Sequence, residues 1–124
     1  MSESRREKSN KRILILANND VGLYRFRKDL IMALLESGNE VTISLPDGDF
    51  VRELEKLGCK FIDTPIDRRG MNPLRDLGLF NHYRKLLRNL KPDLVITYTI
   101  KPNIYGGFAA RLAGIPYAVN ITGL

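Results

Sequence analysis

The sequence predicts an α/β protein with one doubly wound, Rossmann-like sheet of parallel strands in the order 3-2-1-4-5. Three observations support this fold class. Continuous apolar runs such as Ile13–Ala17 are typical of strands that are buried on both faces. Strand and helix patterns alternate along the chain, which favours right-handed crossovers between parallel strands. Residues 92–120 combine a strand, a small-residue helix and a second strand, so the pattern continues to the end of the sequence.

The apolar runs predict strands over residues 13–17, 40–45, 60–63 and 94–97, and after Gly114-Ile115-Pro116. The third strand is short and has polar flanks, so we expect it at a sheet edge. Residues 1–11 are polar and lack core side chains, which predicts a disordered tail followed by a domain over 12–124.

Helical spacing and cap signals predict helices over residues 23–37, 50–57, 73–90 and 104–113. The inner face of the first is predicted to comprise Leu23, Phe26, Leu30, Ala33 and Leu34. Asp49 is expected to cap the second helix, and Pro73 to begin the third. The third helix is predicted to bury Leu77, Phe80, Tyr83, Leu87 and Leu90. Its outer side is predicted to carry Arg75, His82, Arg84, Lys85 and Arg88.

Composition limits the possible functions. The 124 residues suffice for one domain with one moderate core. The net charge of +6 favours an anionic partner such as nucleic acid, a phosphorylated metabolite or an acidic lipid surface, although basic residues can also serve solubility alone. No apolar run approaches the ~20 residues that span a bilayer and the N-terminus is hydrophilic, so we expect a cytoplasmic protein. Cys59 is the only cysteine, which excludes a disulfide framework and a thiolate metal site.

We predict the ligand site where the first and fourth strands end. In doubly wound sheets, neighbouring strands whose helices leave to opposite faces form a crevice at this edge. It is bordered by residues 18–22 and 98–103 in the predicted topology, with 66–72 nearby. The candidate side chains are Asn18, Asp20, Gly22, Tyr98, Thr99, Lys101, Asn103, Arg68 and Arg69.

Several of these candidates have a structural alternative. Asp20 can cap the first helix or accept from a sugar hydroxyl, and Asn103 can cap the fourth helix or donate to one. Lys101 offers a cation. The guanidinium groups of Arg68 and Arg69 match phosphate oxygens, but a solvated loop pair fits the sequence equally well. Gly106-Gly107 allows either close helix–sheet packing or close approach to a ligand.

Common catalytic fingerprints are missing from the sequence. There is no G-x-G-x-x-G after the first strand, no Walker A motif and no G-x-S-x-G. A single histidine, His82, argues against a catalytic triad and a histidine-based zinc site, and its predicted position is solvent-facing.

Three segments, taken in order, resemble the acceptor-side half of family 4 glycosyltransferases with the GT-B fold. They are VGLYRFRKDLIMALLESGNEVTISLP, FVRELEKLGCKFIDTPIDRRGMNP and KPDLVITYTIKPNIYGGFAARLAGIPYAVNITGL. The likeness extends from Lys11 to Leu124 and is strongest to bacterial members that extend lipid-linked sugars, such as N-acetylgalactosaminyl- and galacturonosyltransferases. Its single motifs are moderately specific, and their shared order carries the resemblance.

The resemblance implies a retaining transfer of sugar from a nucleotide-sugar to a glycan or polyprenyl-diphosphate-linked acceptor, with no bound cofactor or catalytic metal. It implies that residues 18–22 and Arg25 face the cleft, and that the RRGMNP segment and residues 101–103 hold the acceptor. Thr122 and Gly123 are implied to lie at a junction between domains. It also implies that the enzyme acts at the inner face of the plasma membrane, where the basic helix faces could contact anionic lipid.

The sequence departs from many relatives at two histidine positions. Ile96-Thr97-Tyr98 replaces a His-x-His pattern, and Thr122 replaces a His before a glycine, so no histidine role can be transferred. Because the donor-binding half is missing from this sequence, we expect a fragment that does not catalyse transfer alone. The alternative is a receiver-like or flavodoxin-like signalling module, with Asp20 and Asp63 as acidic residues but no lysine after the fifth strand. Nucleic-acid binding would rest on charge alone.

Overall fold

A computed structural model describes residues 10–66, 70 and 72–120 of the chain. Its strands are β2 (Arg12–Leu16), β3 (Glu40–Leu45), β4 (Lys60–Asp63), β5 (Leu94–Tyr98) and β6 (Tyr117–Asn120). They form one parallel sheet in the order β4-β3-β2-β5-β6. This order confirms the predicted 3-2-1-4-5 arrangement and the edge position of the third strand.

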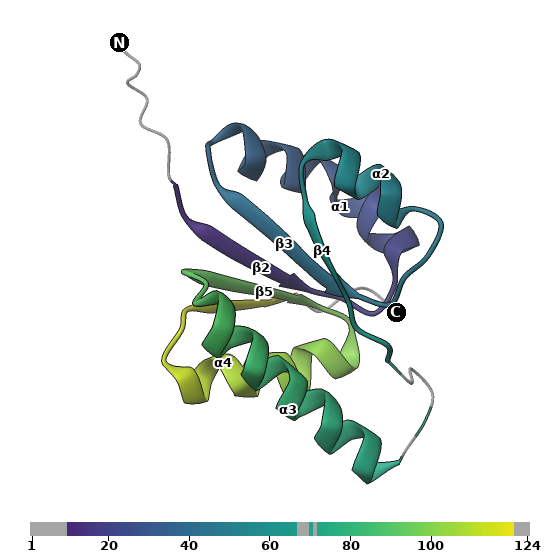
Figure 1. Cartoon of the computed structure of the whole chain (residues 1–124), viewed down its shortest axis with the longest axis vertical. Helices are drawn as coiled ribbons and strands as arrows, with labels where there is room; N and C mark the ends of the chain where they lie inside the picture. The colour runs from purple at the N-terminus through teal and green to yellow at the C-terminus, as the bar shows by residue number, and fades with distance from the viewer. Residues whose placement is uncertain (1–9, 67–69, 71, 121–124) are drawn as a thin grey trace.

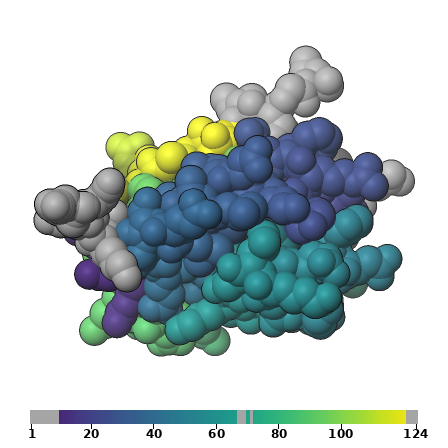
Figure 2. Space-filling model, turned by 90° about the horizontal axis from the view of Figure 1, so that it is seen from above, coloured from purple at the N-terminus to yellow at the C-terminus, as the bar shows by residue number. Residues whose placement is uncertain are grey.

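Helices cover both faces of the sheet (Figure 1). On one face lie α1 (Asp20–Glu36) and α2 (Val51–Leu57). On the other lie α3 (Pro73–Leu90), the π-helical turn η1 (Pro102–Gly106) and α4 (Gly107–Ala113). Figure 2 views the first face and shows α1 and α2 packed side by side, with the yellow end of the chain visible beyond α1.

The core consists of two apolar layers, one on each side of the sheet. Ile13 and Ile15 of β2 point into the layer under α1 and α2, whereas Leu14 and Leu16 point into the layer under α3 and α4. All four side chains are at most 4% exposed. Because alternate side chains of a strand point to opposite faces, the uninterrupted apolar run of β2 fits a strand covered on both sides.

The predicted inner face of α1 is wrong in part. Phe26 is 78% exposed and Leu30 is 41% exposed, whereas Leu23 and Ile31 are buried. The helix is rotated so that Arg27 lies over the ring of Tyr98, with its guanidinium carbon 5.0 Å from the ring centroid. The aliphatic part of an arginine side chain can cover apolar surface. A prediction that counts only apolar residues therefore assigned the wrong residues to the buried face of α1.

The bounds of α3 agree with the prediction, but its buried face is displaced. Leu77 is 55% exposed, whereas Leu79 and Leu86, which were not predicted, are buried. Tyr83 and Leu87 are buried as expected. The same rotation brings His82 from the predicted outer side into a half-buried position beside β4, where it contacts Thr64.

Candidate functional site

The carboxyl ends of β2 and β5 are adjacent, because Leu16 pairs with Thr97 in the parallel register. Residues 18–22 follow β2 and lead into α1 on one face, while residues 99–103 follow β5 and lead into η1 on the other. The structure therefore brings the two predicted segments to one edge of the sheet, at the point where the connections diverge.

Asn19, and not Asp20, caps α1, which begins three residues earlier than predicted. The Asn19 side-chain oxygen accepts from the Gly22 amide at 2.7 Å, and its amide nitrogen donates to Asn18 Oδ1 at 2.8 Å. A Cβ on Gly22 would lie 3.3 Å from Asn19 Oδ1, so the glycine gives the cap room. The polar atoms of this turn are thus largely engaged with one another.

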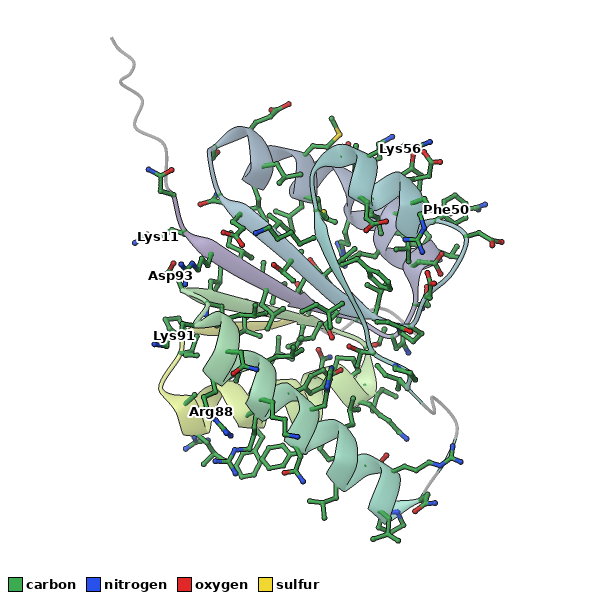
Figure 3. The ribbon with its side chains drawn as sticks, in the orientation of Figure 1. Lys11, Phe50, Lys56, Arg88, Lys91 and Asp93 are labelled. Atoms are coloured by element: carbon green, nitrogen blue, oxygen red, sulfur yellow. The ribbon has the colours of Figure 1, made fainter. Side chains whose placement is uncertain are left out.

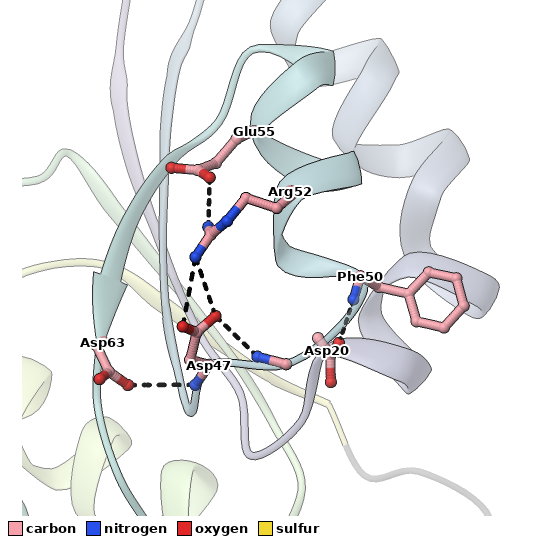
Figure 4. Close-up of polar contacts among 7 residues, drawn as sticks. Asp20, Asp47, Phe50, Arg52, Glu55 and Asp63 are labelled. Atoms are coloured by element: carbon pink, nitrogen blue, oxygen red, sulfur yellow. Dashed lines mark hydrogen bonds and ion pairs between the residues drawn. The ribbon is translucent and has the colours of Figure 1, made fainter.

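Asp20 joins α1 to the connection before α2. It is 7% exposed, and its Oδ2 accepts from the Phe50 amide at 2.6 Å (Figure 4). This bond serves the start of α2, where the predicted Asp49 cap is wrong because α2 has no side-chain cap bond. Gly48 passes so close that a Cβ there would lie 2.5 Å from Asp20 Oδ1. Arg25 is exposed nearby, with its guanidinium carbon 5.8 Å from the Phe50 ring centroid.

The exit of β5 is a sharp turn. Tyr98 is 5% exposed, and burial raises its pKa against the opposing effect of Arg27. Thr99 has φ 73°, a left-handed conformation that is unusual for a β-branched residue and costs of order 1–3 kcal/mol. The helical backbone begins at Ile100, directly after Thr99. Lys101 and Asn103 therefore lie in the first helical turns and not in a loop.

Asn103 is not a helix cap, contrary to the prediction. Its Oδ1 accepts from Thr97 Oγ1 at 2.7 Å and its Nδ2 donates to the Asn120 carbonyl at 2.9 Å. Asn120 in turn donates to the Thr97 carbonyl at 3.4 Å. Asn103 therefore links η1 to the ends of β5 and β6.

Lys101 is held within the chain. Its Nζ lies 2.8 Å from Asp76 Oδ1 of α3 and 2.9 Å from the Gly70 carbonyl, while Tyr105 donates to Asp76 Oδ2 at 3.0 Å. The hydrogen bond from Lys101, with a further one from Tyr105, lowers the pKa of Asp76 despite some desolvation. The hydrogen bond to Asp76 raises the pKa of Tyr105. This triad joins η1 to α3.

A second polar cluster lies between β3, β4 and α3. Ser44 and Thr64 hydroxyls are 2.6 Å apart, and Thr64 Oγ1 lies 3.0 Å from His82 Nε2. Burial, with the neighbouring Lys85 as a smaller cause, lowers the pKa of His82. The cluster borders a groove of about 610 Å³ lined by Thr64, Pro65, Ile66, Arg75, Asp76, Gly78, Leu79, His82 and Lys101.

The sequence indicated neither of these clusters, because their members are 18 to 31 residues apart and follow no motif spacing. Four predicted site residues, Arg68, Arg69, Thr122 and Gly123, lie outside the described part of the chain. Among the described residues, no group of three or more His, Cys, Asp or Glu side chains is placed to hold a metal ion.

The sequence profile of the family described as "Glycosyl transferase 4-like" matches residues 12–124. The chain belongs to this glycosyltransferase family. Over 106 residues it is 34% identical to the N,N'-diacetylbacillosaminyl-diphospho-undecaprenol alpha-1,3-N-acetylgalactosaminyltransferase of Campylobacter jejuni. The match covers 86% of this chain and 28% of that relative, so the chain spans about a quarter of the relative's length.

Solved structures share the fold. A glycosyltransferase from Rickettsia africae superposes with a TM-score of 0.74 at 18% identity, over 90% of this chain and 29% of that one. The C-terminal domain of PF1911 hydrogenase from Pyrococcus furiosus superposes with a TM-score of 0.69 at 21% identity, over 92% of this chain and 93% of that domain. Because a hydrogenase domain shares it, the sheet alone does not decide function, and the family assignment comes from the sequence match. The fold agrees with the Rossmann-like half of a GT-B glycosyltransferase.

Proposed function

We propose that residues 12–124 form the acceptor-binding domain of a retaining glycosyltransferase. The enzyme would transfer a sugar from a nucleotide-sugar to a glycan acceptor linked to polyprenyl diphosphate. The observation that carries this proposal is the family match over the whole domain, together with a relative whose name specifies transfer to a sugar on diphospho-undecaprenol. The catalytic centre would also need a donor-binding domain, so the 124 residues alone should bind acceptor without turnover.

The geometry of the sheet edge where β2 and β5 end supports this assignment. Its two rims come from strand ends that are adjacent in the sheet, and they present the turn 18–22 and the helical start after β5. We propose that substrate contacts come from residues at these two rims, namely Asn18, Gly22, Arg25, Tyr98 and Thr99. Asp20, Lys101 and Asn103 already bond within the chain, so we propose that they hold the rims in place for ligand contacts by their neighbours.

Acceptor binding can be tested by amide NMR titration of the chain. A water-soluble N-acetylhexosamine diphosphate carrying a short prenyl chain serves as acceptor probe, and a uridine diphosphate sugar as donor probe. We expect the acceptor probe to shift amides in 18–22 and 97–103 and the donor probe to shift them at least tenfold less strongly at equal concentration. Absence of any response to the acceptor probe would overturn the proposal. A small phosphodonor with Mg²⁺ tests the receiver alternative, which predicts stoichiometric aspartyl phosphorylation.

We also propose that the enzyme acts at the inner face of the plasma membrane through the surface formed by α3, η1 and α4. Exposed apolar side chains on this surface are Leu74, Leu77, Ile104, Phe108 and Leu112. Exposed cations are Arg75, Arg84, Lys85, Arg88, Lys91 and Arg111. Figure 3 shows Arg88 and Lys91 near the end of α3, on the opposite side of the sheet from Lys56. No helix in the described ranges is long and apolar enough to cross a bilayer.

A further inference from the structure

We propose that a pocket between the C-terminal ends of α3 and α4 binds one anionic phospholipid of the bilayer, by its phosphate and the adjoining part of its acyl chain. This inference rests on the membrane surface proposed above and names a defined site within it. The pocket has a volume of about 440 Å³, within the ordinary range for small-molecule sites. Figure 3 labels two of its lining residues, Arg88 and Lys91, where the end of α3 lies beside α4.

The cations of this pocket are not balanced by carboxylates. Arg84, Arg88 and Lys91 line it and are exposed, and none of the described residues that line it is acidic. Between Leu77 and Leu124 the sequence has a single acidic side chain, that of Asp93. Three cations grouped at one pocket attract an anion, and the forked guanidinium groups match the oxygens of a phosphate.

The side chains of Arg88 and Lys91 are not used to complete the end of α3. Basic side chains at a helix C-terminus often bond to the last carbonyls. Here the Leu87 carbonyl accepts from the Lys91 amide at 3.0 Å, and the Leu90 carbonyl accepts from Arg12 Nη1 at 3.3 Å. Neither side chain forms a hydrogen bond or an ion pair within the described ranges, so both cations are available to a ligand.

The backbone of Lys91 has a conformation that favours glycine. Lys91 is the C-cap of α3, with φ 48° and ψ 59° in the left-handed region. The C-cap of α4 is also left-handed, and there the residue is Gly114. Helix termination alone would therefore be served better by glycine at position 91. Binding of an anion by the ammonium group gives a reason for lysine.

Apolar side chains form the rest of the pocket. Leu87 and Ala109 are at most 3% exposed, whereas Leu112 is 57% exposed. The remaining apolar lining residues are Pro92, Ala113 and Ile115. Inorganic phosphate would contact the cations alone, and an uncharged lipid would contact the apolar residues alone. An anionic phospholipid has chemical groups for both.

The pocket lies at the other end of the sheet from the proposed acceptor contacts. Pro92 and Ile115 come shortly before β5 and β6, whereas the acceptor contacts follow the ends of β2 and β5. Along α3, Arg88 is about 18 Å from Asp76, which bonds to Lys101 at the acceptor edge, since a helix rises about 1.5 Å per residue. The pocket ligand is therefore a lipid of the surrounding bilayer and not the acceptor that reacts.

Three variants that each remove one positive charge test the pocket. Lys91→Gly and Arg88→Gln remove cations that line it, and glycine also suits the left-handed backbone at position 91, so Lys91→Gly should keep the fold. Arg111→Gln is the matched control, because Arg111 is exposed on α4 but does not line the pocket.

The probe is dihexanoyl phosphatidylglycerol below its critical micelle concentration, and binding is followed by amide NMR titration. We expect saturable shifts in residues 84–92 and 109–115. Lys91→Gly and Arg88→Gln should each weaken binding about fivefold, the effect of one cation at an anionic headgroup, and Arg111→Gln by less than about twofold. Dihexanoyl phosphatidylcholine and inorganic phosphate should each bind at least about tenfold more weakly, because each lacks either the net charge or the acyl chain.

Equal weakening by all three variants would show that net charge, and not the pocket, attracts the lipid. Equal affinity for phosphatidylcholine or inorganic phosphate would overturn the ligand class. Tighter binding of the prenylated acceptor probe in the pocket, or lipid shifts confined to residues 18–22 and 97–103, would overturn the assignment to a bilayer lipid. If the parent floats with anionic vesicles but the soluble lipid does not bind, the pocket alone is overturned. If the parent neither floats nor binds the soluble lipid, the proposed membrane surface is overturned as well.

Discussion

Side chains at the carboxyl edge of the sheet mostly bond to one another. Lys101 and Asn103 have the chemistry that anion and sugar recognition requires, yet the first pairs with Asp76 and the second joins Thr97 to Asn120. Both elements of the rim are therefore fixed before any ligand arrives. For the ligand contacts proposed at this edge, a pre-organised rim would lower the ordering cost of binding.

Removing the hydroxyl of Tyr83 should stabilise the fold. This hydroxyl is fully buried and has no hydrogen-bond partner among the described residues, and burial raises its pKa. A buried unpaired polar group costs about 1–3 kcal/mol, so Tyr83→Phe should raise the free energy of unfolding by about 1 kcal/mol. Urea unfolding should show a higher midpoint with an unchanged slope. Tyr105→Phe, which removes the bond to Asp76, should change stability in the opposite direction. A lower midpoint for Tyr83→Phe would contradict the prediction.

The pairing of Asp76 with Lys101 should contribute to the acid sensitivity of the fold. The folded pKa of Asp76 is below its ordinary value of 3.8, chiefly because of the Lys101 hydrogen bond. The carboxylate therefore contributes stability above pH 3.8, and this contribution disappears as the pH falls through the lower folded pKa. Asp76→Asn should flatten the stability profile below about pH 4 relative to the parent, because the group that titrates there is removed. Glu40, whose pKa is lowered chiefly by its hydrogen bond with Lys60, is unchanged in both proteins. Parallel profiles would therefore disprove the contribution of Asp76.

At the scale of the elements, the packing of η1 against β2 and β5 depends on Gly106. A Cβ on Gly106 would lie 2.4 Å from Leu16 Cδ1 and 3.3 Å from Thr97 Cγ2, and Leu16 is completely buried. The structure therefore favours close packing as the reason for this glycine.

Gly106→Ala should destabilise the protein by about 1–3 kcal/mol, because the core must shift to accept the methyl group. Gly107→Ala is the matched control: its Cβ would make an ordinary contact at 3.4 Å with Val119, and alanine favours the helix. We expect the control to be neutral or slightly stabilising. Equal unfolding midpoints for the two variants in thermal denaturation would show that η1 can move away from β2.

The elements themselves were largely predictable, and their rotations were not. Apolar runs placed all five strands, and helical spacing with Pro73 at the start gave the bounds of α3, because these signals act locally. The rotation of α1 depends on Arg27 covering Tyr98, and that of α3 on a tertiary contact between His82 and Thr64. No local pattern encodes such contacts. The adjacency of the two strand exits was predictable from topology, whereas the groove was not.

At the scale of the whole molecule, the two faces differ in what they expose. The surface of α3, η1 and α4 combines exposed leucine, isoleucine and phenylalanine side chains with arginine and lysine. Much of the opposite face pairs its charges locally, as in Arg52 with Asp47 and Glu55 (Figure 4) and Lys56 with Glu53. Arginine and lysine side chains grouped beside exposed apolar side chains on one surface suit an anionic lipid surface better than uniform solvation does.

Reversing three charges on α3 should abolish most membrane association. Near an anionic surface each Lys or Arg contributes about 1 kcal/mol, so Arg84→Glu, Lys85→Glu and Arg88→Glu together should lower partitioning at least about a hundredfold. Flotation with vesicles containing phosphatidylserine or phosphatidylglycerol measures this directly. The control reverses Lys28, Arg52 and Lys56 on α1 and α2, which gives the same net charge on the other side of the sheet. If both triple variants lose flotation equally, net charge alone drives association; if the α3 variant still floats like the parent, the membrane does not bind this surface. Loss confined to the α3 variant would place the groove and the crevice beside the membrane, where a lipid-linked acceptor can reach them.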